Sequence, residues 1–82
     1  MPSHPADADH ALAAAIRRLR KERGLTQEEL AHAAGVTFGT VSRLELAQGE
    51  PGWMTVRKIA QALGLTLSEL GTAIDAEDPA AS

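Results

Sequence analysis

Apolar residues recur every three or four positions along most of this chain, which is the spacing of amphipathic α-helices. Leu12, Ile16 and Leu19 follow this spacing, and Gly24 comes after them where a helix would end. No stretch alternates apolar and polar residues as a half-buried β-strand does. The pattern predicts an all-α fold with five helices, over residues 9–23, 27–34, 37–46, 53–63 and from Thr66 to about Ile74.

Signals at the expected helix starts agree with this pattern. Thr26 with Glu29, and Thr66 with Glu69, match the capping box, in which both side chains bond backbone N–H groups at the helix start. Helices this short are marginal alone, so they must share one hydrophobic core. Trp53 begins the fourth helix, and we expect it to lie in that core or to pack as a hydrophobic staple beside it, rather than to form a platform for a ligand.

The two ends of the chain differ in composition from the middle. Residues 1–8 contain two prolines among small polar residues, and residues 75–82 are acidic and rich in alanine. We expect flexible tails over 1–8 and 75–82 around a single domain over 9–74, since 82 residues suffice for one small domain. The sequence has neither a secretory signal pattern nor an apolar stretch that could span a bilayer. A cytoplasmic protein without membrane contact is the prediction.

The net charge is −3, which argues against a polyanionic partner until the positions of the charges are considered. All eight Lys and Arg residues lie between residues 11 and 70, where six glutamates leave a balance of +2. Five of the eight fall within residues 17–23. Such a cluster can bind a DNA backbone or can form a solvated helix face, and charge alone does not choose between them.

The sequence shows no arrangement of residues typical of catalysis. Cysteine is absent, no nucleophile has a neighbouring base, and no glycine-rich loop could hold a phosphate. His4, His10 and His32 lack a third ligand at a spacing that would bind a metal ion. We therefore expect no enzymatic activity, no metal and no cofactor.

The second and third expected helices are joined by only about three residues around Gly35. So short a connection requires a steep crossing, for which Ala31 supplies a small contact residue and Gly35 tolerates a positive φ. Val41 and Leu44, three residues apart, would face the core. This pattern is typical of a helix-turn-helix whose second helix projects, with four residues facing outward: Phe38, Gly39, Ser42 and Arg43.

Residues 12–70 resemble the Cro/phage-repressor type of helix-turn-helix domain, also called the XRE family. The matching motifs are RxxRGLTQEELA, AGVT, VSRLE and IAQALGLTLSEL. The resemblance implies a compact five-helix, lambda-repressor-like fold. It also implies a sequence-specific transcriptional regulator, a Cro-like repressor among the options, that binds double-stranded DNA with the helix 37–46 in the major groove.

The resemblance further implies roles for single residues. Four would contact base edges: Phe38, Gly39, Ser42 and Arg43. Three would contact DNA phosphates: Gln27, Thr37 and Thr40. A buried ion pair would join Arg20 to Glu45.

Some of these roles stay open at this point. Phe38 can contact a thymine methyl group, but it would turn into the core if its helix began one residue later. Arg43 matches guanine O6 and N7, yet it could equally hold a phosphate. The chain also departs from the family pattern, because Leu46 and Ala47 stand where a basic residue and a glycine are usual.

One recognition helix reads only a few base pairs, so we expect a two-fold homodimer that binds half-sites about 34 Å apart. Leu67 and Ile74, seven residues apart on the last helix, are the predicted dimer contacts. Two alternatives remain. The chain could be an antitoxin or a restriction-modification controller that answers to a partner protein, or a helix-turn-helix scaffold used only for protein–protein contact.

Overall fold

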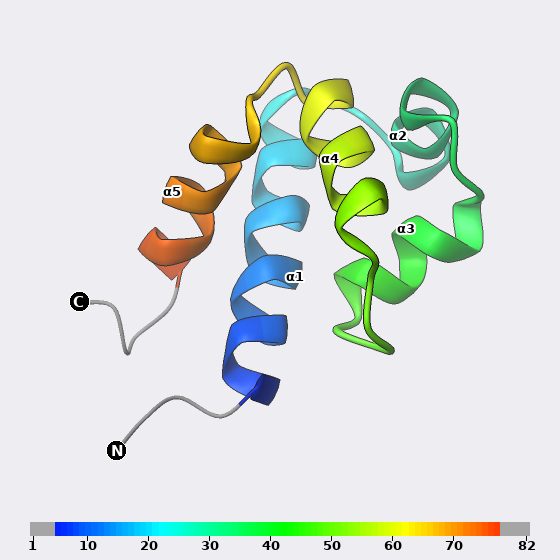
Figure 1. Cartoon of the computed structure of the whole chain (residues 1–82). Coiled ribbons are helices and arrows are strands. Elements are labelled where there is room, and N and C mark those ends of the chain that lie inside the picture. The colour runs from blue at the N-terminus through cyan, green and yellow to red at the C-terminus, as the bar shows by residue number, and fades with distance from the viewer. Residues whose placement is uncertain (1–4, 78–82) are drawn as a thin grey trace.

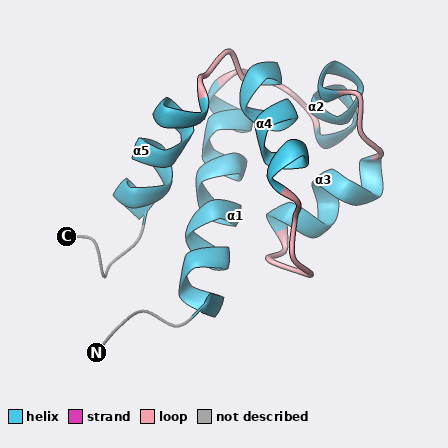
Figure 2. Cartoon of the chain, viewed as in Figure 1, coloured by secondary structure: helices cyan, strands magenta, loops and turns pink. Residues whose placement is uncertain are grey.

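The computed structural model describes residues 5–77, which form five α-helices and no strands (Figures 1 and 2). The helices are α1 (Pro5–Glu22), α2 (Gln27–Ala34), α3 (Phe38–Glu45), α4 (Trp53–Ala62) and α5 (Leu67–Glu77). This confirms the all-α, five-helix prediction. The bounds of α2 agree with the predicted ones, while α3 is one residue shorter at each end because Thr37 and Leu46 are its caps.

Both outer helices extend into the segments that we expected to be tails. Helix α1 already begins at Pro5, and proline is favoured in the first position of a helix because its fixed φ suits that place. Helix α5 continues to Glu77, whose carboxylate accepts a hydrogen bond of 2.7 Å from Arg18 Nε on α1. The rest of the expected tails, 1–4 and 78–82, lies outside the described residues.

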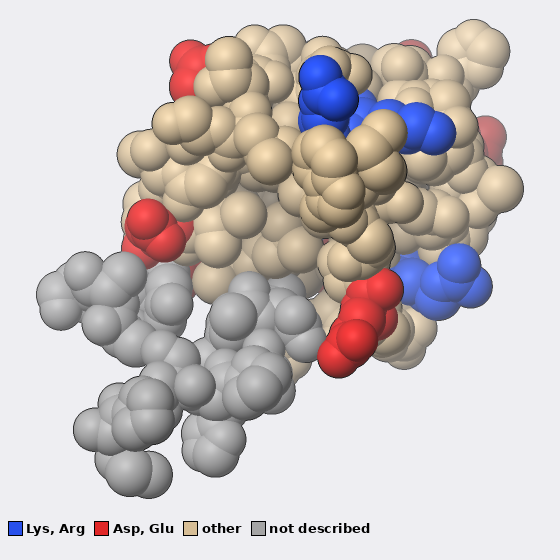
Figure 3. Space-filling model, viewed as in Figure 1, with Lys and Arg blue, Asp and Glu red and all other residues tan. Residues whose placement is uncertain are grey.

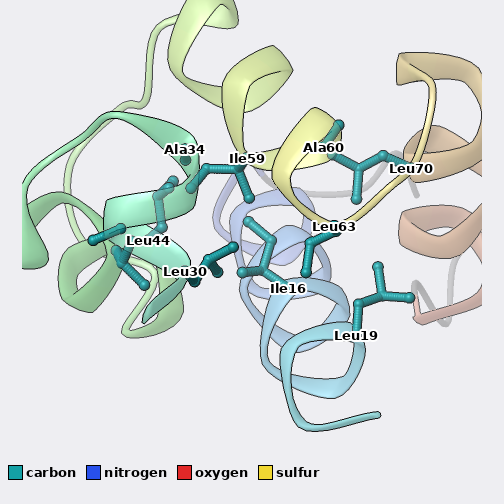
Figure 4. Close-up of a cluster of buried hydrophobic side chains, with 11 residues drawn as sticks. Ile16, Leu19, Leu30, Ala34, Leu44, Ile59, Ala60, Leu63 and Leu70 are labelled. Atoms are coloured by element: carbon teal, nitrogen blue, oxygen red, sulfur yellow. The ribbon is translucent and has the colours of Figure 1, made fainter. Parts of the chain in front are cut away.

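One core holds the five helices together. Helix α1 packs against α3 and α5, α2 packs against α3 and α4, and α4 also contacts α5. Figure 4 shows buried aliphatic side chains from all five helices, with Ile16 of α1 between Leu30 of α2 and Leu63 at the end of α4. The largest fully buried members are Ile16, Leu30, Val41, Ile59, Leu63 and Leu70. Burial of each such side chain contributes about 1.5–3 kcal/mol to the stability of the fold. Helices this short depend on that contribution, because their own hydrogen bonds do not keep them folded in water.

The prediction that Trp53 lies in the core or in a staple is wrong. Its side chain is 62% exposed at the first position of α4, after the N-cap Gly52. The buried residues of α4 are Ile59 and Ala60, so the helix enters the core only after its first turn. Instead, the Arg57 guanidinium lies over the Trp53 ring, 5.8 Å from its centre, at the range of a cation–π contact.

None of the helices in the described part of the chain combines the length and the apolar character needed to cross a membrane.

Candidate nucleic-acid interface

The turn between α2 and α3 depends on one left-handed glycine. Gly35 has φ +70° and ψ 33°, and its N–H bonds to the carbonyls of Ala31 and His32. The next N–H, of Val36, also bonds to the Ala31 carbonyl at 3.0 Å. These bonds use the free carbonyls at the end of α2 and reverse the chain within one residue, so that α3 begins three residues later at Phe38.

Thr37 fixes the start of α3. Its Oγ1 accepts a hydrogen bond of 3.1 Å from the backbone N–H of Thr40 and lies 2.9 Å from the hydroxyl of Thr40. A threonine cap of this kind stabilises a helix start by about 1 kcal/mol. The first turn of α3 is therefore closed by its own two threonines.

Helix α3 has one buried and one exposed face. Val41, Leu44 and Glu45 are buried, and they hold the helix against the rest of the domain. The predicted base-contacting residues lie on the other side: Phe38 is 49% exposed, Gly39 and Arg43 are exposed, and Ser42 is partly exposed. The alternative of Phe38 as a core residue is therefore wrong. Figure 1 shows α3 at one edge of the domain.

Glu45 is the one buried charged residue among residues 10–77, and its carboxylate joins three helices. Its exposure is 2%. Arg20 of α1 donates from Nε and Nη2 at 2.6 and 2.9 Å, and Gln27 of α2 donates from Nε2 at 3.0 Å. Arg17 donates to the backbone carbonyl of the same glutamate. The ion pair that the resemblance implied thus lies in a network that ties α1 and α2 to the last turn of α3.

The network determines the ionisation of its members. Burial alone would raise the pKa of Glu45, but the hydrogen bonds from Arg20 and Gln27 and the charges of Arg20 and Arg17 lower it below its ordinary value. The hydrogen bonds from Arg20 to this carboxylate raise the pKa of the arginine in turn. The pair is therefore fully charged at neutral pH.

Gln27 lies at the first position of α2, where we predicted a phosphate contact. One of its two amide hydrogens is used by Glu45. The side chain is partly exposed, and its second amide hydrogen has no protein partner among the described residues. Glu45 therefore holds the amide in a set position beside the N-terminus of α2.

The basic residues of 17–23 largely serve the fold. Besides the contacts of Arg17 and Arg20 with Glu45, Arg18 bonds to Glu22 and Glu77, and Arg23 bonds to the Leu63 carbonyl at the end of α4. Sequence reasoning missed the long-range contacts of Arg17, Arg18 and Arg23 because they join residues 28 to 59 positions apart. The remaining cations, which form no ion pair within the described range, are Lys21, Arg43, Arg57 and Lys58. Figure 3 shows basic groups over the side formed by α2, α3 and α4.

A hollow lies between α3 and the loop that follows it, residues 46–52. Its volume is about 260 Å³, and Thr40 and Arg43 line it together with loop residues from Gln48 to Gly52. Ala47, the second residue of this loop, has φ 56°, a left-handed conformation that alanine rarely adopts. The sequence predicted a loop here but gave no sign of this hollow beside the exposed face of α3.

Comparisons with known proteins agree with this geometry. A family model described as helix-turn-helix matches residues 16–70. An uncharacterized HTH-type transcriptional regulator from Methanothermobacter thermautotrophicus is 51% identical over 49 residues, which cover 60% of this chain and 71% of that protein. The cryptic phage CTXphi transcriptional repressor RstR of Vibrio cholerae is 42% identical over 55 residues, 67% of this chain and 50% of the repressor.

The fold also matches that of a solved structure. The crystal structure of the clp gene regulator ClgR from Corynebacterium glutamicum superposes with a TM-score of 0.79 and 30% sequence identity, over 87% of this chain and 91% of the other. The matched residues 16–70 include α2, α3 and α4 complete, and with them the exposed face of α3.

Proposed function

This chain belongs to the helix-turn-helix family of DNA-binding transcriptional regulators, and from that premise we propose that α3 enters the major groove of double-stranded DNA and reads its sequence. The observation that supports this most is the division of α3 into a buried face with Val41 and Leu44 and an outward face with Phe38 and Arg43. Because one face of α3 packs against the domain, the opposite face is free to lie along the major groove of DNA. The protein then acts by binding, without catalysis, on DNA in the cytoplasm.

Four residues of α3 make the base contacts in this proposal: Phe38, Gly39, Ser42 and Arg43. Arg43 is the strongest hydrogen-bond donor among them, and its guanidinium matches O6 and N7 of guanine. It forms no ion pair within the described residues, so no carboxylate must be displaced before it can bind a base.

Three residues hold the DNA backbone: Gln27, Thr37 and Thr40. Gln27 has one amide hydrogen left for a phosphate once Glu45 has taken the other. The two threonine hydroxyls share a single hydrogen between them, which leaves one hydroxyl hydrogen to donate. Phosphate contacts of this kind set the position of α3 on the duplex without reading sequence.

We further propose a two-fold homodimer through α5. Leu67 is 43% exposed at the first position of that helix, whereas Ile74 packs partly against the core. Leu67 would then supply the central contact and Ile74 its edge. Two copies of α3 would bind half-sites one helical turn, about 34 Å, apart.

The experiment is selection of duplexes from a random pool at a fixed salt concentration, followed by binding titrations. Arg43→Ala should weaken binding to the selected site by about 1–3 kcal/mol and relax the preference at one base pair. Lys58→Ala removes an exposed cation of α4 instead and is the matched control, which should leave every base preference unchanged. Equal loss on all sequences would make Arg43 a phosphate contact, and a protein that binds no duplex would refute the proposed function.

A further inference from the structure

The first turn of α3 presents mostly apolar surface. Phe38 has no hydrogen-bonding group and is half exposed, and Gly39 next to it has no side chain. The hydroxyls of Thr37 and Thr40 bond to each other, and Thr37 also accepts from the backbone. Beside the one threonine hydroxyl hydrogen that stays free to donate, this turn therefore offers an aromatic ring and a backbone without a side chain at Gly39.

Gly39 has no reason inside the protein to be glycine. It is helical without a positive φ, and a Cβ atom added there would meet only the Thr37 hydroxyl oxygen, at 3.9 Å, which is ordinary contact. Alanine is the better helix former, so glycine weakens α3 without any gain in packing. A position like this suits the close approach of another molecule, and it brings the neighbouring Phe38 ring nearer to that molecule.

The major groove contains one apolar group that a phenyl ring can select. Thymine carries a methyl group on C5, whereas cytosine has only hydrogen there. Resting on the proposed function, we propose that Phe38 recognises the C5-methyl group of a pyrimidine, with Gly39 allowing α3 to approach closely enough. The methyl group has two sources in DNA, thymine and 5-methylcytosine.

The size of the effect follows from the apolar contact. Removing one methyl group from water changes an equilibrium constant about fourfold. A site that lacks the methyl group should therefore bind about fourfold more weakly per protein copy, with unchanged salt dependence, because no phosphate contact is altered.

The experiment replaces each thymine of the selected duplex in turn by deoxyuridine, which lacks only the methyl group. The wild-type protein should lose about fourfold in affinity at one position of each half-site. Phe38→Ala should bind both duplexes equally, while Phe38→Leu should keep part of the difference. Leu46→Ala is the matched control, because Leu46 is also exposed but caps the opposite end of α3, and it should behave as the wild type does.

A second arm separates the two sources of the methyl group. Cytosine or 5-methylcytosine is placed at the position where deoxyuridine weakens binding. If 5-methylcytosine restores the affinity that cytosine loses, the recognition extends to methylated DNA. Failure to recover would restrict it to thymine. Circular dichroism verifies that each variant is folded, and Gly39→Ala should raise the midpoint of thermal unfolding while weakening DNA binding.

Two results overturn the proposal while leaving the proposed function intact. One is equal wild-type affinity for thymine and uracil at every position, and the other is a methyl effect that persists in Phe38→Ala. Loss of duplex binding by the wild type itself would refute both.

Discussion

Replacing Glu45 by glutamine tests whether the buried network holds the recognition helix in place. The substitution keeps the size of the side chain but removes its charge and one of its two acceptor oxygens. With its amide oxygen in the place of Oε1, which accepts from both Arg20 and Gln27, the glutamine would turn its amide group toward Arg20 Nε, donor against donor, and Arg20 would keep only one of its two hydrogen bonds. The Arg20 guanidinium, only 12% exposed, would lose its counter-charge.

These contacts determine how much folding stability Glu45→Gln should lose. Removing one partner of a buried ion pair costs about 3–5 kcal/mol, and the retained shape and single acceptor place Glu45→Gln at the lower end, about 3 kcal/mol. For a domain of this size, the midpoint of thermal unfolding would fall by about 12–24 °C. The double variant Arg20→Met/Glu45→Leu should be more stable than Glu45→Gln, because it leaves no buried charge without a partner.

The pH dependence gives a second readout with a defined sign. The folded state lowers the pKa of Glu45, so its contribution to stability is complete above the ordinary pKa of 4.5 and is lost as the pH falls through the lower value of the folded state. Urea unfolding between pH 7 and pH 3 should show the wild type losing its advantage over Glu45→Gln below pH 4.5. A gap between the two proteins that stays constant over this range would refute the role given to the Glu45 carboxylate.

Three further predictions test other parts of the structure. Ala47→Gly should stabilise the protein by about 0.5–1 kcal/mol in urea unfolding, because glycine adopts φ 56° without the strain that alanine has there. Ala33→Gly, on the exposed side of α2, is the control and should destabilise the protein by about 1 kcal/mol. A change in stability of the same sign in both variants would contradict the strain at Ala47. Gln27→Ala should reduce affinity for every duplex alike and leave the salt dependence of binding unchanged, because its amide carries no charge, and a loss confined to one operator position would exclude a phosphate contact. Leu67→Glu should give monomers with an unchanged helical circular dichroism spectrum, and an unaltered sedimentation mass would place the dimer contact elsewhere.

The local features of the fold could be predicted from the sequence because neighbouring residues determine them. Both capping boxes are present: Thr26 with Glu29 and Thr66 with Glu69 exchange hydrogen bonds of 2.8–3.1 Å. The left-handed Gly35 follows from its place after α2. The outward direction of Phe38 follows from the start of α3 after Thr37, which caps the helix with its own side chain.

Features that depend on distant partners could not be predicted in this way. Helical spacing indicates which face of α4 carries Trp53, but it does not indicate where along its length α4 enters the core. Trp53 lies in the first turn of α4, before the helix reaches the core. The arginines at 17, 18 and 23 look like a DNA-binding cluster in the sequence. In the fold they bond to groups that the chain brings back from far along its length.

The Glu45 network was predicted from the sequence in one part and found only in the structure in another. The resemblance of the chain to its family implied the pair with Arg20, but the bond from Gln27 to the same carboxylate emerged only in three dimensions. That bond matters for function, because it connects a proposed phosphate contact on α2 to the helix that is proposed to read the bases.

The central proposal is that α3 is the part of the molecule that lies in the groove. Titration of the isotope-labelled protein with its selected duplex, followed by backbone amide NMR, measures this directly at every residue. The largest shift changes should occur from Thr37 to Arg43, with a further change at Gln27 and little change in the middle of α1. Saturable duplex binding that leaves the α3 amides unchanged would contradict the proposal.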